Sequence, residues 1–472
     1  MPAFFSFQIP PYPLDSLTRE FPNPTDFLTR GGSLHQVLGF AFGIAVLIGN
    51  TIGVGILRTP GEIAGHLPSV GWFLAVWVIG GVYALLGAMS LAEPAAMIKR
   101  SGGQYPIVHR ALGPYAGFVV GWSDWLSTCA STGLGAMVFA EYAMPLLPAF
   151  PGGTAAIASV LVLFFGVLQW RGVKSGDIAQ QLLSAGKALA FGALIVACFI
   201  LAAPERAVAA AAVLPTGTAF IAAFVLALQS VIFTYDGWTG PLYFGEETVD
   251  AGRSLPRAMV AGVIVVILIY VLLSLGQLRV LGVDAMARDP FTAASTGAAL
   301  FGARGDLIIR LLVLCSILGA VNAIVMIVSR IPLAMARDGL MPVSLDSVNS
   351  GGTPTVAHWT SIGIAIGFIL TGTFNSVLAL AAFFFVATYL VSFSAVFALR
   401  RKEPDTPRPY RIPGFPYTTG LVLLGSAAFL VGAVLSDRSN SLRSMLLLAA
   451  SYPVYLLVLR MRRPPGAALD SR

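Results

Sequence analysis

The chain has 472 residues, of which 57% are hydrophobic and only 11% are charged. A soluble domain usually carries about 25% charged residues, so a water-exposed globule is excluded and lipid is the expected solvent for most of the chain. The net charge of +7 does not indicate a nucleic-acid partner, because the basic residues lie in short segments between apolar runs. The first 33 residues are polar and rich in proline, so we predict no cleaved signal peptide.

Long apolar runs in the remainder predict membrane-spanning helices. A helix needs about 20 apolar residues to cross the hydrocarbon core, and only a helix satisfies its own backbone there. The sequence therefore predicts an all-α integral membrane protein with twelve transmembrane helices. The predicted spans are 38–65, 71–98, 114–145, 154–170, 179–203, 219–247, 257–279, 306–332, 356–374, 377–399, 417–436 and 442–460.

The loops between these spans predict the orientation. Most of the 29 Lys and Arg residues fall on the side that holds both chain ends, including the run Arg400–Lys402. Cytoplasmic loops carry the excess of basic residues. We therefore expect both termini in the cytoplasm and the chain in the cell membrane, surrounded by lipid.

Two of the predicted spans are interrupted near their middles. The first contains Gly49–Leu57, with glycines at 53 and 55, and the sixth contains Phe233–Pro241, with Gly237 and a terminal proline. Glycine and proline lower helix stability by about 1 and 3 kcal/mol relative to alanine. We predict that both helices are unwound at mid-membrane. Interrupted helices at corresponding places in two halves are the best sequence indication of a transporter binding site.

This pairing predicts two five-helix repeats and sets the expected organisation of the chain. The expected segments are a cytoplasmic tail (1–34), a first repeat (35–203), a second repeat (204–400), two further helices (401–460) and a second cytoplasmic tail (461–472).

The two interruptions present opposite backbone groups to a ligand. Free N–H groups of Gly53, Val54, Gly55 and Ile56 would start a half-helix, and such an end attracts a carboxylate. Carbonyl groups would end the other half-helix and attract a cation; these belong to Phe233, Thr234, Tyr235 and Asp236. Together they suit a zwitterionic α-amino acid. The alternative is that the glycines only allow close helix packing.

Lys187 is the most unusual single residue, because it lies about nine residues into the fifth predicted span. At 1.5 Å per residue this is on the order of 13 Å deep, and a buried ammonium group in a membrane is a functional candidate. The alternative is that the span starts later and that Lys187 anchors its cytoplasmic end.

Three other polar residues lie within predicted spans: Asp124 in the third, Asp236 in the sixth and Asn322 in the eighth. Either carboxylate could recognise a cationic substrate or carry a proton, but for both we prefer a structural role. Asn322 is expected to line the pocket or to join two helices. Glu93 and Glu247 lie near cytoplasmic ends, where ion pairs with loop arginines are expected.

The chemistry of an enzyme is not indicated. The sequence has no phosphate-binding G-x-x-x-x-G-K-[ST] loop, no nucleophile elbow and only four scattered histidines. We therefore predict neither a cofactor nor a bound metal.

At the level of motifs, the chain resembles the amino acid–polyamine–organocation superfamily, most of all its L-amino-acid transporter branch. The resemblance covers about residues 35–416. It is carried by the order and spacing of Gly53-x-Gly55-Ile56, Ser101–Tyr105, Gly113-Pro114, Gly121-Trp122, Phe233-x-Tyr235-x-Gly237-Trp238, Glu246-Glu247, Pro256–Ala258, Ala336–Pro342 and Arg408–Gly414.

This resemblance implies the inverted five-plus-five fold of the leucine-transporter type with two extra helices. It implies that N–H groups at Val54 and Gly55 hold the substrate carboxylate. Carbonyl groups would hold the substrate amino group; those implied are at Thr51, Phe233, Thr234 and Asp236. The Phe233 ring would gate the site from outside, and Lys187 would stand where sodium-coupled relatives bind sodium.

The chain departs from the family pattern at two positions. Val54 replaces a small hydroxyl residue between the two glycines, and Asp236 replaces a glycine or other small residue. The loop 146–153 has no cysteine, so we expect no disulfide-linked heavy subunit.

The leading functional hypothesis is a sodium-independent amino-acid transporter, either an exchanger or a proton-linked permease, that works by alternating access. A transporter of a polyamine or another amine such as γ-aminobutyrate is the alternative that Asp124 and Asp236 suggest. A third hypothesis is a membrane sensor that binds amino acids without moving them.

Overall fold

The computed structural model describes residues 39–147, 150–171, 176–201, 214–349 and 351–461. Two predicted tails lie outside the described residues: all of 1–34, and 461–472 except for Met461. The predicted boundary between the repeats at 203–204 also lies outside them. The described part is built from helices in the order α1 (Phe40–Thr51), α2 (Val54–His66), α3 (Val70–Ile98), α4 (Tyr105–Leu112), α5 (Pro114–Ala143), η3 (Met144–Leu146), α6 (Gly153–Trp170), α7 (Gly176–Ile200), α8 (Gly217–Tyr235), η4 (Gly240–Phe244), α9 (Ala251–Leu281), α10 (Val283–Met286), α11 (Thr292–Phe301), α12 (Ala303–Val328), α13 (Arg330–Arg337), η5 (Val343–Asp346), α14 (Thr355–Thr371), α15 (Phe374–Lys402), α16 (Tyr417–Ser436), α17 (Arg438–Ala449) and α18 (Ser451–Met461).

Helices occupy each of the twelve apolar ranges predicted from the sequence. Within the described residues, eight helical segments are long and apolar enough to cross a membrane, or nine if α1 and the helix after it are one span bent by 44°. The protein is therefore a multi-pass helical membrane protein, whereas twelve crossings and an inverted repeat stay predictions. The shorter apolar segments are Ser184–Ile200 of α7 and Thr355–Thr371 of α14.

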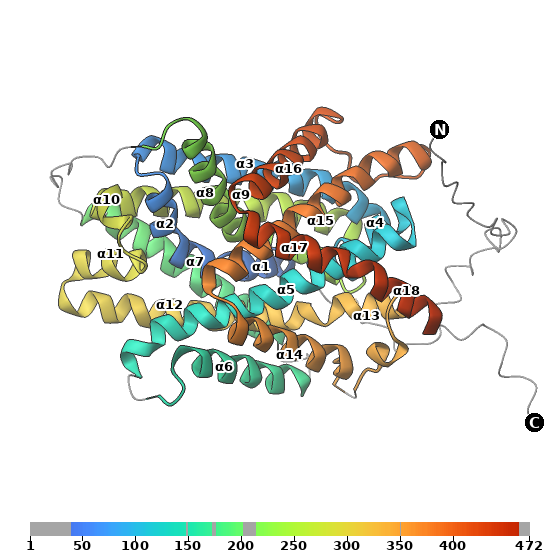
Figure 1. The fold of residues 1–472 in the computed structure, drawn as a ribbon, viewed down its shortest axis with the longest axis horizontal. Helices are drawn as coiled ribbons and strands as arrows, with labels where there is room; N and C mark the ends of the chain where they lie inside the picture. Colours follow the sequence, from blue (N-terminus) through green and yellow to red (C-terminus); the bar gives the residue numbers. More distant parts are fainter. Residues whose placement is uncertain (1–38, 148–149, 172–175, 202–213, 350, 462–472) are drawn as a thin grey trace, which may run out of the picture.

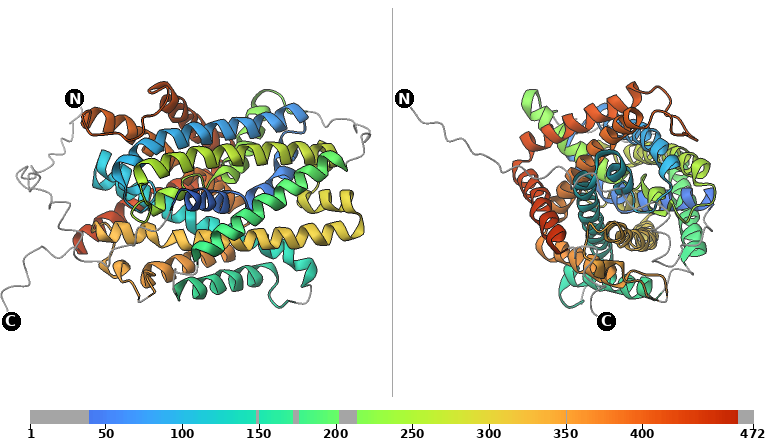
Figure 2. Two further views of the ribbon diagram at one scale, coloured as in Figure 1. Left: turned by 180° about the vertical axis from the view of Figure 1, so that it is seen from behind. Right: turned by 90° about the vertical axis from the view of Figure 1, so that its right-hand side faces the viewer.

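Most long helices run roughly along one common direction, with α1 and α5 near the centre (Figures 1 and 2). Helix α5 packs against α12, α14 and α15, and α1 packs against α7, α9 and α12. In the apolar windows of Leu307–Arg337 and Phe374–Lys402, 78% of residues are buried, against 28% in α16 and 17% in Arg438–Met461. The first two segments therefore belong to the protein core, and the last two lie at its periphery.

The outer helices present large apolar side chains to their surroundings. Leu189 and Ile200 of α7 are 75% and 73% exposed, and Leu424 and Leu435 of α16 are 69% and 67% exposed. Such a surface is unfavourable in water and matches a lipid environment.

A buried ion-pair cluster joins α3 to the end of α15 and the segment that follows. Both oxygens of the Glu93 carboxylate are used: the side chain lies 2.5 Å from Arg400 and 3.0 Å from Arg408, and it accepts a bond from the Ile412 backbone N–H. Only 2% of the Glu93 side chain is exposed. The ion pairs expected from the sequence for Glu93 are confirmed, and Glu247 likewise lies 3.6 Å from Arg330.

We expect Glu93→Gln to lower the free energy of unfolding by about 3–5 kcal/mol, because the change removes the buried carboxylate that pairs with Arg408 and with the half-buried Arg400. The matched control is Glu403→Gln, since Glu403 pairs with Arg110 where both side chains are partly exposed. That control should change stability by less than about 1 kcal/mol. Thermal unfolding of the purified variants in detergent measures the difference, and equal melting temperatures would contradict the role of Glu93.

Candidate substrate cavity

The first interruption separates α1 from α2. Helix α1 ends at Thr51, Ile52 is extended (φ −79°, ψ 105°), and α2 begins at Val54. Close approach explains the two glycines here. A Cβ on Gly53 would lie 2.9 Å from the Ala320 Cβ, and a Cβ on Gly55 would lie 2.6 Å from the Thr234 Cα.

The second interruption follows α8, which ends at Tyr235. Asp236 leaves the helical conformation (φ −58°, ψ 152°), and the chain resumes as the short helix η4. Gly237 has φ +111°, a conformation that other residues rarely adopt, and a Cβ there would lie 2.7 Å from the Thr51 hydroxyl oxygen. The two interruptions are therefore in direct contact.

Side-chain hydroxyls join the two interruptions. The Tyr270 hydroxyl, from α9, lies 2.6 Å from the Thr51 carbonyl oxygen and 3.0 Å from the Thr234 carbonyl oxygen. The Thr59 hydroxyl donates to the Gly55 carbonyl, and its oxygen lies 2.8 Å from the Thr234 hydroxyl oxygen. Backbone groups released by the interruptions thus find partners inside the protein, as an apolar interior requires.

Lys187 of α7 binds backbone carbonyl groups at the first interruption. Its ammonium group donates to the carbonyl oxygens of Gly49 and Ile52, each at 3.2 Å, and the residue is only 5% exposed. One turn earlier, the Ser184 hydroxyl donates to the Ala45 carbonyl at 2.8 Å. Lys187 therefore lies buried against the C-terminal end of α1, where free carbonyl groups favour a cation.

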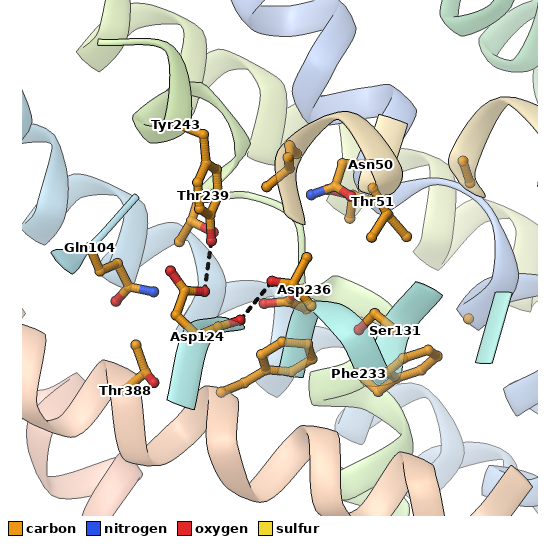
Figure 3. Close-up of a pocket in the computed structure, with 16 residues that line it drawn as sticks. Asn50, Thr51, Gln104, Asp124, Ser131, Phe233, Asp236, Thr239, Tyr243 and Thr388 are labelled. Atoms are coloured by element: carbon orange, nitrogen blue, oxygen red, sulfur yellow. Dashed lines mark hydrogen bonds between the residues drawn. The ribbon is translucent and has the colours of Figure 1, made fainter. Parts of the chain in front are cut away.

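A cavity of about 50 Å³ opens between the two interruptions (Figure 3). Such a volume holds a few water molecules. Its walls come from α1, α2, α5, α8, α12, α15 and the segments beside α4 and η4. The lining residues are Asn50, Thr51, Gly55, Gln104, Asp124, Thr128, Ser131, Phe233, Asp236, Thr239, Tyr243, Ala320, Ile324, Ile327, Phe385 and Thr388.

Two carboxylates lie on the walls of this cavity. Asp124 accepts a 2.7 Å hydrogen bond from the Tyr243 hydroxyl, and Asp236 accepts one from the Tyr389 hydroxyl. Figure 3 shows the Tyr243 contact and places Asp236 between Asp124 and Thr51. Among the described residues that line the cavity there is no Lys, Arg or His. The lining itself is therefore acidic.

Five of the residues singled out in the sequence line the cavity: Thr51, Gly55, Asp124, Phe233 and Asp236.

Others lie in the same two segments but outside the lining: Gly53, Ile56, Thr234, Tyr235 and Gly237. The side chain of Val54 lies outside what the structure describes, although its backbone begins α2.

Asn322 does not line the cavity; it accepts a hydrogen bond from the Gln169 amide and so joins α12 to α6.

Several lining residues were not singled out from the sequence. Thr128 and Ser131 follow Asp124 by four and seven residues, a spacing that places all three on one face of α5 and was available as a signal. Gln104 and Tyr243 gave no such signal, because they lie in short segments whose position depends on the tertiary fold.

Comparison with known proteins agrees with this geometry. The family model for amino acid permeases matches residues 37–458 of the chain. The chain belongs to the amino acid permease family. Within the amino acid–polyamine–organocation superfamily it falls on the L-amino-acid transporter branch, as its relatives show. The protein is thus a membrane transporter of amino acids and not an enzyme.

Three relatives illustrate the branch. The serine/threonine exchanger SteT of Bacillus subtilis is 28% identical over 432 residues, which cover 90% of this chain and 98% of that protein. The b(0,+)-type amino acid transporter 1 of Mus musculus is 26% identical, over 86% of this chain and 84% of its own length. The large neutral amino acids transporter small subunit 2 of Rattus norvegicus is 27% identical, over 93% and 84%.

We expect Gly55→Ala to destabilise the permease by about 1–3 kcal/mol, because its methyl group would overlap the Thr234 backbone, which cannot turn away. The matched control is Gly363→Ala in α14, where no heavy atom lies within 4 Å of the new methyl group. That control should raise helix stability by roughly 1 kcal/mol. Melting temperatures of the two purified variants decide the matter, and a shift in the same direction for both would contradict the close contact.

Proposed function

We propose that this permease carries α-amino acids by sodium-independent alternating access, as an exchanger or together with protons, and that its substrate binds in the cavity between the two helix interruptions. The observation that carries the proposal is the contact between the start of α2 and the end of α8 at one wall of this cavity.

The start of α2 is the proposed receptor for the substrate carboxylate. The first N–H groups of a helix have no partner within it, and the helix end carries a positive partial charge. The N–H groups concerned are those of Gly53, Val54, Gly55 and Ile56. A carboxylate accepts such bonds without any cationic side chain, which agrees with the absence of one from the described lining.

The end of α8 and the end of α1 are the proposed receptors for the substrate ammonium group. The carbonyl groups concerned are those of Thr51, Phe233, Thr234, Tyr235 and Asp236. A carbonyl oxygen has two lone pairs, so Thr51 and Thr234 keep one for substrate while Tyr270 uses the other. The Phe233 ring, which lines the cavity, is proposed to cover the bound substrate.

Lys187 is proposed to replace a coupling sodium ion. Its ammonium group already binds the Gly49 and Ile52 carbonyls, and these are hard oxygen ligands of the kind that would otherwise attract a small cation. A fixed ammonium at this place removes the need for an ion, so transport should proceed without sodium.

The twelve predicted spans and two five-helix repeats, 35–203 and 204–400, complete the proposal, with two further helices at 401–460. We place both termini in the cytoplasm of a cell-membrane protein, on the basic-loop asymmetry of the sequence. We further propose that the chain works without a disulfide-linked partner, since the loop 146–153 has no cysteine.

Counterflow in proteoliposomes tests the function. Vesicles loaded with one unlabelled amino acid and diluted into the labelled form should accumulate label equally in sodium and in choline buffer. A panel of neutral, cationic and acidic amino acids, with and without a pH gradient, identifies the substrate and the coupling. Binding without any accumulation would instead indicate a sensor, and dependence on sodium would contradict the role of Lys187.

Lys187→Ala should abolish counterflow while the protein stays folded, because the carbonyls at the end of α1 lose their cation. Lys402→Ala is the matched control: its ammonium group also binds a backbone carbonyl, that of Ala111, but on the surface away from the cavity. The control should keep its uptake. Uptake by Lys187→Ala at the unaltered rate would show that the lysine only anchors α7.

A further inference from the structure

Several buried polar side-chain atoms on the lining of the cavity have no partner among the described residues. Within the described residues, five such atoms lie on its lining: the Thr51, Ser131 and Thr388 hydroxyl oxygens, the Gln104 side-chain oxygen and the Asp124 Oδ2. Each buried polar atom without a partner costs about 1–3 kcal/mol. Polar atoms of this kind on the wall of a cavity can take their partners from a molecule bound there.

Among these groups, the Asp124 carboxylate has the strongest need for a hydrogen-bond partner. Its Oδ1 accepts the Tyr243 hydroxyl, whereas its Oδ2 has no partner, and the residue is only 4% exposed. An ionised carboxylate needs a donor at Oδ2, and a protonated one needs an acceptor there. The described residues supply neither, and because Asp124 lines the cavity, a molecule bound there can supply this partner.

The backbone beside Asp124 packs closely against the carboxylate, and the residue there must be a glycine. Gly103 has φ +69°, and a Cβ there would lie 2.9 Å from Asp124 Oδ2 and 2.4 Å from the Tyr243 ring. The next residue, Gln104, turns its side chain toward the cavity and also has an unpaired oxygen. A group with several donors could bind both Asp124 Oδ2 and the Gln104 oxygen, whereas a single proton could serve only one.

This pair lies away from the helix interruptions. In Figure 3, Gln104, Asp124 and Tyr243 lie together on one side of Asp236, Asn50 and Thr51 lie on the other, and Phe233 lies beside Ser131. A substrate whose α-amino and α-carboxylate groups bind on the side of Thr51 would therefore extend its side chain toward Asp124.

The charge of the cavity lining indicates which kind of substrate side chain it favours. Two carboxylates line the cavity, and the lining described here contains no cationic residue. A neutral zwitterion adds no net charge, whereas a basic amino acid adds one positive charge and places it at the far end of its side chain. Charge-assisted hydrogen bonds are about twice as strong as neutral ones.

We propose that Asp124, supported by Tyr243 and Gln104, forms a second subsite that binds the distal ammonium or guanidinium group of a basic amino acid. The inference rests on the proposed function, because the α-amino and α-carboxylate groups are taken to bind at the interruptions. It assigns the carrier to cationic amino acids as substrates.

Counterflow of labelled lysine and of a labelled neutral amino acid, measured in the same proteoliposomes, tests the subsite. In the unaltered protein both should be exchanged. Asp124→Asn should raise the KM for lysine roughly 10- to 100-fold, as expected for loss of a charged hydrogen-bond partner. The KM for the neutral substrate should change less than about threefold. Asp405→Asn, at an exposed position in the segment after α15, is the matched control and should change neither KM.

The outcomes separate the subsite from the proposed function. Exchange of neutral amino acids but not of lysine by the unaltered protein would overturn the subsite and leave the function standing. Equal losses for both substrates in a folded Asp124→Asn variant would show a structural role and also overturn it. Loss of pH dependence for the neutral substrate, with lysine unchanged, would show that Asp124 carries a proton instead.

Two further results concern the function itself. If the unaltered protein exchanges no amino acid, the proposed function fails. If it exchanges 1,5-diaminopentane as well as it exchanges lysine, the subsite stands but the α-carboxylate receptor at α2 fails.

Discussion

Satisfaction of backbone groups at two interrupted helices is the constraint on which the rest of this structure depends. An interrupted helix releases N–H and carbonyl groups, and no lipid can bind them. Here the released carbonyls find the Tyr270 hydroxyl and the Lys187 ammonium, so α9 and α7 must pack against the interruption in α1. The glycines at 55 and 237 then let the two interrupted chains touch. Of these two segments, Thr51, Gly55, Phe233 and Asp236 line the cavity.

The charged side chains around the cavity differ from those on its lining. The ion pairs lie outside the cavity lining: Glu93 with its two arginines joins α3 to the end of α15, and Arg58 lies 3.1 Å from Glu141 and so joins α2 to α5. In these clusters each charged side chain has a partner of opposite sign. The cavity carboxylates are instead bonded to neutral groups, Asp124 to the Tyr243 hydroxyl and Asp236 to the Tyr389 hydroxyl. Their charge is therefore available to a ligand.

The sequence predicted the elements well where the physical signal is local. Apolar runs located the helices, and clusters of glycine and polar residues within two of these runs pointed to the helix ends near Gly53 and Gly237. The number of membrane crossings is harder to predict, because some spans contain polar residues that lower their hydropathy. Helix α5 contains Asp124 and several hydroxyl residues, and it is not among the segments that are apolar enough to count as a membrane span.

The residues that line the cavity were only partly predictable from the sequence, because many of their contacts join distant parts of the chain. Residues on the interrupted segments could be named, and five of those named line the cavity. The bond between Asp124 and Tyr243 joins residues 119 positions apart, and the partner of Asn322 lies 153 positions away. No local pattern encodes such contacts, because the packing of whole helices decides them. Helical periodicity does encode one feature of the site, namely that Asp124, Thr128 and Ser131 lie on one polar face of α5.

The central claim is that a zwitterion is held at both of its charged ends by helix interruptions. Calorimetric titration of the purified permease with a transported amino acid, its methyl ester and the corresponding decarboxylated amine tests this claim most directly. We expect the amino acid to bind and the ester and the amine each to bind at least about tenfold more weakly, because each lacks the carboxylate that the α2 N–H groups are proposed to bind. Equal affinity for all three would contradict it.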